Sequence, residues 1–214
     1  MEDLDELGRG VAKFRSKVFP TRRALFERLA NSQEPKALFL TCADSRIIPS
    51  LITQTGPGEL FIERNPGNIV PVYSDIAVGV SASIEYAIAA LGAKHVIVCG
   101  HSDCGAVRGM MQPEKLAGMS AVGRWLSYGA EAASRLSCDG GDPSDEARLQ
   151  RLTRLNVIVQ IEHLQSHPSV RAAQDRGDLH IHGWVYDIAT GGVEAYDPQT
   201  GAFRAFPMAP VMSI

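Results

Sequence analysis

The sequence predicts an α/β fold, with a mostly parallel central sheet flanked by helices, an N-terminal helical arm and a C-terminal hairpin. Short apolar runs of strand length alternate with longer segments whose apolar residues have helical spacing. Apolar residues also have helical spacing in the first thirty positions, and a Thr-Gly-Gly turn at residues 190–192 separates two strand-like runs. We therefore expect an arm over residues 1–34 and one domain over residues 35–214.

The composition is that of an ordinary soluble protein. The 214 residues are 45% hydrophobic and 21% charged, and the formal net charge is −3. Such a mixed charge favours neither nucleic-acid binding nor a membrane-binding face. The longest apolar run, residues 78–91, is interrupted by polar and small residues and is predicted to be a packed helix.

The location follows from two further observations. The N-terminal segment is acidic and lacks the basic and apolar regions of a secretory signal. Four cysteines in a chain of this size without such a signal make a disulfide framework unexpected. We therefore expect a cytoplasmic protein.

The arm has apolar residues at helical spacing, and Pro20 is predicted to divide it into two helices. The apolar positions include Leu7, Val11, Phe14 and Val18. Such an arm packs either on its own domain or on a neighbour, and the sequence leaves both open.

Three strands are predicted at residues 36–42, 59–64 and 94–99, and the first and third are expected to be buried. The second follows a Thr-Gly-Pro-Gly turn, and Gly100 is predicted to end the third. Between the second and third strands, a long helix is expected over residues 75–91, ending at Gly92.

The second half of the chain continues the alternation. Helices are expected from Gly105, over residues 121–162 with a break at the polar loop 138–144, and over residues 169–175. Residues 179–187 alternate like a strand, and the turn at 190–192 leads into a return strand at 193–196.

Two polar clusters follow two of the buried strands directly. The first is Cys42-Ala43-Asp44-Ser45-Arg46, and the second is His101-Ser102-Asp103-Cys104-Gly105. Because ligand sites of parallel sheets form beyond the carboxyl ends of the strands, both clusters are expected at one edge of the sheet.

The side chains of Cys42, His101 and Cys104 suit a zinc ion. Zinc accepts thiolate and imidazole ligands and prefers four of them in a tetrahedron. Three protein ligands leave the fourth position open, which is typical of a catalytic site. The sequence therefore predicts a catalytic zinc centre.

Asp44 and Arg46 add a pair that a plain zinc site does not need. Alternate residues of an extended chain face the same way, so Asp44 is expected beside the metal, with Arg46 close enough for a bidentate pair. The alternative is a solvated surface pair, and the position directly after a thiolate ligand favours the functional interpretation.

These motifs resemble the β-class carbonic anhydrases. CADSR and HSDCG look like the family signature, and FIERNPGN (61–68), SIEYAIAALG (83–92) and HGWVYDI (182–188) also match. The resemblance covers nearly the whole chain and is closest to the plant-like and bacterial cyanate-associated branch. It implies a catalytic domain over residues 35–214, with one Zn²⁺ per subunit on Cys42, His101 and Cys104.

The resemblance also implies how substrate is bound. Carbon dioxide and bicarbonate would occupy a pocket formed by Gln33, Phe61, Tyr86 and the backbone amide of Gly105. In the family the first three come from the neighbouring subunit. A homodimer, or a multiple of dimers such as a homotetramer, with the active site at the dimer interface is therefore expected.

One position departs from the family's allosterically regulated branch. That branch has Trp three residues before the first zinc Cys, within a non-catalytic bicarbonate site, whereas this chain has Phe39, which lacks the indole donor. Arg64 and Tyr186 look like the other members of that site. We therefore expect the open form, in which Asp44 is paired with Arg46 and water completes the zinc shell.

The implied reaction is the reversible hydration of carbon dioxide to bicarbonate and a proton, by attack of zinc-bound hydroxide. Asp44 would orient the hydroxide, and Arg46 would keep Asp44 ionised and away from the metal. The alternatives are a carbonyl sulfide or carbon disulfide hydrolase on the same scaffold and a non-catalytic zinc module that binds bicarbonate.

The remaining histidines and cysteines have less specific interpretations. His180 and His182 alternate on one strand face, a spacing that could bind a metal, but the better site is already assigned. His95 has no partner visible in the sequence. Cys99 is interpreted as a buried small hydrophobic residue, and Cys138 as a bystander in a polar loop.

Overall fold

The computed structural model describes residues 2–74, 78–138 and 144–206. The chain divides into two compact units, Met1–Glu34 and Pro35–Ile214.

The first unit is helical throughout its described part until residue 29. Helix α1 (Glu2–Lys13) and helix α2 (Arg23–Leu29) are joined by a π-helical turn η1 (Phe14–Val18) and a 3₁₀ turn η2 (Phe19–Arg22). The predicted division at Pro20 is therefore found, but as a change of helix type, with the proline at the start of the 3₁₀ turn. The rings of Phe14, Phe19 and Phe26 lie 5.3 to 6.2 Å apart and pack the bend.

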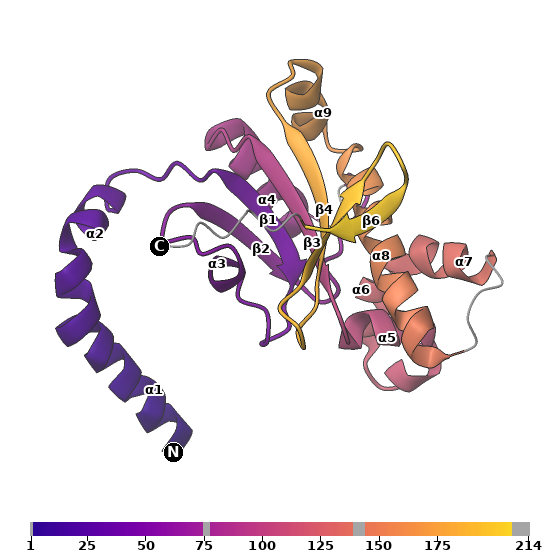
Figure 1. Ribbon diagram of the computed structural model, residues 1–214, viewed down its shortest axis with the longest axis horizontal. Coiled ribbons are helices and arrows are strands. Elements are labelled where there is room, and N and C mark those ends of the chain that lie inside the picture. Colours follow the sequence, from indigo (N-terminus) through magenta and orange to yellow (C-terminus); the bar gives the residue numbers. More distant parts are fainter. Residues whose placement is uncertain (1, 75–77, 139–143, 207–214) are drawn as a thin grey trace. The chain divides into compact units, whose positions relative to one another are not determined.

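The second unit is built on a six-stranded sheet in the order β2-β1-β3-β4-β5-β6 (Figure 1). The strands are β1 (Ala37–Cys42), β2 (Leu60–Asn65), β3 (His95–His101), β4 (His180–Tyr186), β5 (Val193–Asp197) and β6 (Ala202–Ala205). The first four in chain order run parallel, and β5 and β6 are antiparallel to their neighbours. The predicted fold class, a mostly parallel sheet with a C-terminal hairpin, is confirmed.

Helices connect the parallel strands. They are α3 (Pro49–Ile52), α4 (Val78–Glu85) with the π-turn η3 (Tyr86–Ala90), α5 (Gly105–Met111), η4 (Pro113–Leu116), α6 (Ser120–Leu126), η5 (Ser127–Gly129), α7 (Ala130–Cys138), α8 (Asp145–Leu164) and α9 (Pro168–Asp175). Helices α5 to α8 are grouped together at one end of the unit (Figure 1). The longest, α8, packs against β3 and β4.

Three elements differ from the sequence prediction. Strand β3 continues through Gly100 to His101, because the glycine provides the space that α8 needs. A Cβ atom on Gly100 would lie 3.0 Å from Val157 Cγ2 and 3.1 Å from Thr153 Cγ2. The short helix α3 and the edge strand β6 were not predicted.

Two other predictions fall partly outside the described residues. The helix expected over residues 75–91 is described from Val78, and it ends before Gly92, whose φ is +68°. The polar loop expected at 138–144 lies largely in the segment 139–143, which is outside the described residues.

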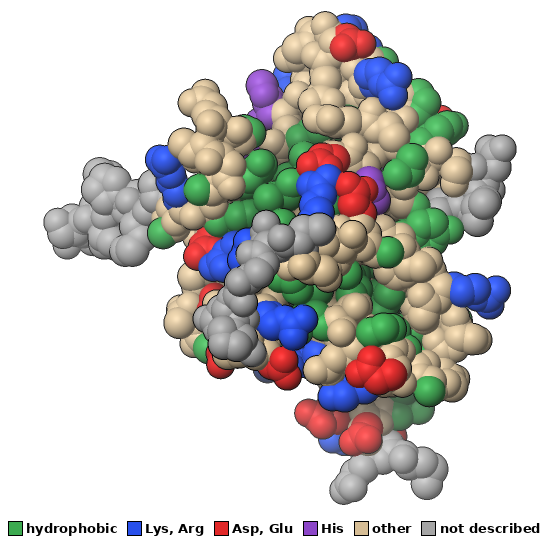
Figure 2. Space-filling model, turned by 90° about the vertical axis from the view of Figure 1, so that its right-hand side faces the viewer, with side chains coloured by type: hydrophobic (Ala, Val, Ile, Leu, Met, Phe, Trp, Pro, Cys, Tyr) green, Lys and Arg blue, Asp and Glu red, His purple; other side chains and the backbone are tan. Residues whose placement is uncertain are grey.

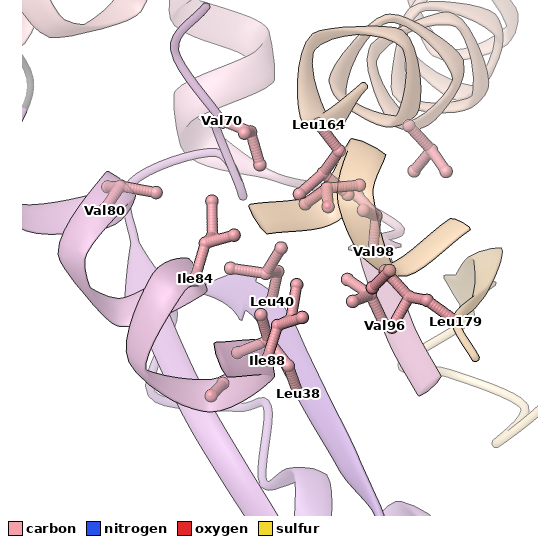
Figure 3. Packing of buried hydrophobic residues seen from close by; sticks show 14 residues of the cluster. Leu38, Leu40, Val70, Val80, Ile84, Ile88, Val96, Val98, Leu164 and Leu179 are labelled. Carbon is pink, nitrogen blue, oxygen red and sulfur yellow. The ribbon is translucent and has the colours of Figure 1, made fainter. Parts of the chain in front are cut away.

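The core lies between one face of the sheet and helices α4, α8 and α9. Leu38 and Leu40 of β1 lie beside Ile84 of α4 and Ile88 of η3 (Figure 3), and Val96 and Val98 of β3 belong to the same cluster. On the opposite face a smaller cluster contains Ala37, Phe39, Ile97 and Cys99. Because both faces of β1 are buried, its sequence is a continuous apolar run rather than an alternation.

The surface carries charges of both signs. On the face shown in Figure 2, basic and acidic side chains lie next to one another, in line with the small net charge. Among the described residues, no helix is long and apolar enough to span a membrane.

Candidate metal centre

The two polar clusters meet at the carboxyl edge of the parallel strands. Strands β1 and β3 are neighbours in register, with Thr41 opposite Cys99, so Cys42 and His101 end the two strands side by side. One ligand atom from each of Cys42, His101 and Cys104 lies within 4.8 Å of the others. The Sγ atoms of the two cysteines are 3.8 Å apart. The structure thus brings together all three predicted ligands.

The orientation of His101 leaves one ring nitrogen for a ligand. Its Nδ1 is 2.9 Å from the backbone oxygen of Ser102. Because a carbonyl oxygen only accepts hydrogen bonds, Nδ1 carries the proton and donates it. In the neutral imidazole the other nitrogen, Nε2, is then unprotonated, and it is buried without a hydrogen-bond partner. A buried polar atom without a partner is costly, and a metal ion would satisfy it.

A tight turn allows His101 and Cys104 to face the same point. Asp103 has φ +52°, in the left-handed region that aspartate tolerates better than most residues. Cys104 is then the residue before α5 and has an extended backbone. Strand β4 and the segment after it fix the turn, because the Ser102 amide donates to Tyr186 O and the Ile188 amide donates to Ser102 Oγ, both at 2.9 Å.

Arg64 and Gly67 fix the loop that follows β1. The Arg64 side chain donates to the backbone oxygens of Cys42 and Asp44, at 3.1 and 2.6 Å. The Gly67 amide donates to Cys42 Sγ at 3.3 Å, from a turn in which Gly67 has φ +81°. Both contacts hold Cys42 in place, and sequence reasoning missed them because they depend on tertiary proximity.

The thiols of Cys42 and Cys104 lie so close together that each changes the pKa of the other. The hydrogen bond from Cys104, together with the one from the Gly67 amide, lowers the pKa of Cys42 despite its burial. The same bond and burial raise the pKa of Cys104, since a second thiolate beside the first is repelled. A divalent cation would favour loss of both thiol protons, so the pair suits a cation better than it suits a vacant pocket.

Asp44 and Arg46 form the predicted bidentate pair. Arg46 Nε is 2.9 Å from Asp44 Oδ1, and Arg46 Nη2 is 2.8 Å from Asp44 Oδ2. The Arg46 side chain holds the pKa of Asp44 well below its usual range. Asp44 Oδ2 also lies 3.8 Å from His101 Nε2, so the carboxylate stands beside the ligand cluster.

Asp103 holds Arg46 from the other side. Its carboxylate is 3.3 Å from Arg46 Nη1 and 2.8 Å from Arg108 Nη2, and its backbone oxygen accepts from Arg46 Nη2 at 3.0 Å. Arg108 first, and Arg46 second, lower the pKa of Asp103. The motif HSDCG contained this residue, but only the structure links it to the Asp44–Arg46 pair.

Of the residues that the family resemblance assigns to substrate, three lie in the second unit. The rings of Phe61, on β2, and Tyr86, at the start of η3, are 5.9 Å apart, and Tyr86 is half exposed. Gly105 is the first residue of α5, and a Cβ atom there would meet nothing within 4 Å. Gln33 belongs to the first unit and is exposed.

The residues considered for a non-catalytic bicarbonate site have structural contacts. Phe39 is fully buried, and its ring packs edge-on against Trp184 at 6.0 Å. Arg64 is engaged with the loop after β1, as described above. Tyr186 packs against the same cluster as Phe39.

Cys99 and His95 do not belong to the group formed by Cys42, His101 and Cys104. Cys99 is buried in β3, and burial raises the pKa of its thiol to about 12. Cys138 is the last residue of α7. His95, for which the sequence showed no partner, lies with its Nδ1 3.1 Å from Nε2 of His182.

Comparison with known proteins assigns the family. Residues 37–193 match the family model described as carbonic anhydrase. A carbonic anhydrase of Pseudomonas aeruginosa is 48% identical over 197 residues, covering 92% of this chain and 88% of that protein. Carbonic anhydrase 1 of Escherichia coli O157:H7 is 45% identical over 204 residues, covering 95% of this chain and 91% of that protein.

Solved structures agree with the sequence relatives. The β-carbonic anhydrase CcaA superposes with a TM-score of 0.94 at 37% identity, covering 98% of this chain and 94% of that one. A structure from a study of two tetrameric β-carbonic anhydrases of Sordaria macrospora has a TM-score of 0.81 at 28% identity, covering 96% of this chain and all of that one. The chain therefore belongs to the β-class carbonic anhydrase family, as its motifs predicted, and is an enzyme of that class.

Proposed function

We propose that this enzyme catalyses the reversible hydration of carbon dioxide to bicarbonate and a proton at a zinc ion held by Cys42, His101 and Cys104. The general reaction of the family is carbon dioxide hydration. The observation that carries the proposal is the convergence of two thiols and the unpartnered, buried Nε2 of His101.

Zinc is the metal that the donor set favours. Two sulfurs and one imidazole nitrogen suit a borderline ion, and three protein ligands leave one position for water. A zinc ion bound there would acidify a water molecule and so supply a nucleophile near neutral pH. We infer one ion per subunit.

Asp44 would orient the attacking oxygen. Its carboxylate, kept ionised by Arg46, can accept a hydrogen bond from the proton on that oxygen and direct a lone pair toward the carbon atom of carbon dioxide. Because both carboxylate oxygens are bonded to Arg46, Asp44 is also restrained from binding the metal itself. This arrangement supports the open form, with water completing the metal shell.

The substrate pocket is proposed from the family pattern. Phe61 would supply an apolar wall, Gln33 a hydrogen bond to a substrate oxygen, and the amide of Gly105 a second donor, with Tyr86 beside Phe61. We propose that Gln33, Phe61 and Tyr86 reach the site from a neighbouring subunit, so that the working unit is a homodimer or a multiple of dimers. The Sordaria macrospora study names tetrameric enzymes, which fits such an assembly.

We also propose a role for each of the two units and a location for the enzyme. Residues 35–214 would form the catalytic domain, and residues 1–34 the helical arm. A cytoplasmic location is supported by the small number of cysteines, four in 214 residues, two of which are proposed metal ligands rather than disulfide partners.

A stopped-flow assay of carbon dioxide hydration, on protein whose zinc content has been measured, tests the proposal. We expect one zinc per chain and turnover proportional to zinc content. Cys42→Ser should lower the zinc content and the rate together, while the buried non-ligand change Cys99→Ser should leave the zinc content unchanged. Zinc-loaded protein that hydrates no carbon dioxide, or that prefers carbonyl sulfide or carbon disulfide, would contradict the assignment.

A further inference from the structure

Three imidazoles meet at the end of the sheet opposite to the cysteine cluster. His95 is the first residue of β3, and His180 is the first residue of β4 and its register partner. His182 lies two residues further along β4, and alternate strand residues face the same way. All three side chains therefore lie on one face of the sheet, at the amino ends of two adjacent strands.

The rings are in close contact. The ring of His95 is stacked on that of His180, with centroids 5.4 Å apart and an interplanar angle of 27°. Its centroid lies 5.3 Å from that of His182. The shortest contact joins His95 Nδ1 to His182 Nε2 at 3.1 Å, so the two nitrogen atoms point toward the same small region.

That separation suits two ligands of one metal ion. Imidazole nitrogens bind transition metals at about 2.0–2.1 Å, so two of them at a right angle or at a tetrahedral angle are about 2.9 to 3.4 Å apart. In the absence of a metal, the same contact is a hydrogen bond in which the two nitrogens share one proton. An ion would take the place of that proton.

We propose that His95 and His182, with His180 as a third ligand, form a second site for a borderline divalent transition-metal ion such as Ni²⁺, Cu²⁺ or Zn²⁺. Imidazole is a favoured ligand of these ions. As the side chains stand, the three rings do not form a compact ligand set. His180 is exposed, so its side chain can turn to bring a nitrogen to the ion, and water would fill the other positions.

The protonation state of the cluster supports metal binding. Burial, with His95 and His180 nearby, lowers the pKa of His182, so this imidazole favours its neutral form. Over the described part of the chain, no carboxylate forms an ion pair with any of the three rings. Binding moves the shared proton to a distal ring nitrogen, so a neutral pair takes up the ion without releasing a proton.

The site is independent of the cysteine centre. Strand β3 begins at His95 and ends at His101, and the six steps between these residues span about 20 Å. The two centres therefore lie at opposite ends of β3, and neither shares a ligand with the other. The second site does not rest on the proposed function of the first.

Calorimetric titration of the zinc-loaded, full-length protein with Ni²⁺ tests the proposal. We expect one Ni²⁺ per chain beyond the zinc, with zinc retention verified by elemental analysis. His95→Gln and His182→Asn should each weaken Ni²⁺ binding at least tenfold, and His180→Asn should weaken it by a smaller factor. Electron paramagnetic resonance of a Cu²⁺-loaded sample should show nitrogen ligands that are lost in the same variants.

His163→Gln is the matched control, because it removes an imidazole that bonds to Val70 O and lies outside the trio. It should leave Ni²⁺ affinity unchanged. Unchanged zinc content and hydration rate in every variant would report an intact fold and an intact cysteine centre. The proposal is overturned if the wild type takes up no second ion, or if the trio variants bind Ni²⁺ as tightly as the wild type.

Discussion

At the scale of single residues, Asp44 separates metal binding from turnover. Asp44→Asn keeps the shape of the side chain but loses the charge that Arg46 pairs with and one oxygen acceptor. We expect zinc content to stay at one per chain, while kcat/KM for carbon dioxide falls about 100-fold or more, as for the loss of a positioned acid–base group. Stopped-flow rates on zinc-quantified protein measure this, and an unchanged rate would remove Asp44 from the mechanism.

Asp103 tests whether the pairing of Arg46 with Asp44 needs support from the second loop. Asp103→Asn tolerates the left-handed backbone at φ +52° and keeps the backbone acceptor, but it weakens the contacts to Arg46 and Arg108. A loss of about 1 kcal/mol in a charged hydrogen bond corresponds to roughly a fivefold lower kcat. KM and zinc content should change little.

Asp178→Asn is the control for Asp103. Asp178 accepts from Arg176 on an exposed surface, and neither residue belongs to the metal centre. Its hydration rate should equal that of the wild type. Equal rates for both variants would mean that Arg46 holds Asp44 without help from Asp103.

At the scale of elements, close packing of α8 on the sheet depends on glycine. A Cβ atom on Gly183 of β4 would lie 2.7 Å from Ile161 Cδ1 and 2.8 Å from Val157 Cγ1. Gly183→Ala should therefore destabilise the fold by about 1–3 kcal/mol through overpacking. Gly123→Ala in α6 is the control, since a Cβ atom there meets nothing within 4 Å and alanine favours the helix by up to about 1 kcal/mol. In thermal unfolding, Gly183→Ala should have a lower Tm than the wild type, and Gly123→Ala should have a higher one.

The elements that the sequence predicted are those with a strong local pattern. Apolar runs marked β1 and β3, which are buried on both faces, and the turn at 190–192 marked the hairpin. Strand β2 is a partly exposed edge strand, and its apolar start after a Thr-Gly-Pro-Gly turn was enough to mark it. Strand β6 is short and lies at the sheet edge, and α3 has four residues, so neither has a periodicity to read. Gly100 was wrongly predicted to end the strand. A glycine is needed there because α8, more than fifty residues further along the chain, packs closely against it.

In the candidate site, too, residues with a local sequence pattern were predicted and residues that act through tertiary contacts were not. Cys42, His101 and Cys104 were found because ligand chemistry and strand ends are both visible in sequence. The roles of Arg64, Gly67 and Asp103 were not, because their contacts join loops that only the fold brings together. The approach of His95 to His182 is of the same kind: it requires the β3–β4 register, which a sequence does not give.

At the scale of the whole molecule, the arm has a stripe of exposed apolar side chains. Leu4, Leu7 and Val11 of α1, followed by Phe14 and Val18, repeat at spacings of three and four residues and are exposed. Phe14 packs against Phe19 and Phe26 at the bend, yet all five side chains remain exposed in the described part of the chain. We infer that a second copy covers this stripe, and that Gln33, just beyond α2, reaches the neighbouring active site.

The double variant Leu7→Asp/Val11→Asp places two charges in the stripe and should lower the molar mass in light scattering to that of smaller species. Arg9→Asp, on the opposite side of α1, adds charge without touching the stripe and should keep the wild-type mass. If Gln33 acts across the interface, the hydration rate per chain should fall with the mass, because a separated subunit lacks its neighbour's pocket residues. An unchanged mass would remove the arm from assembly, whereas a lower mass at full activity would place Gln33 outside the active site.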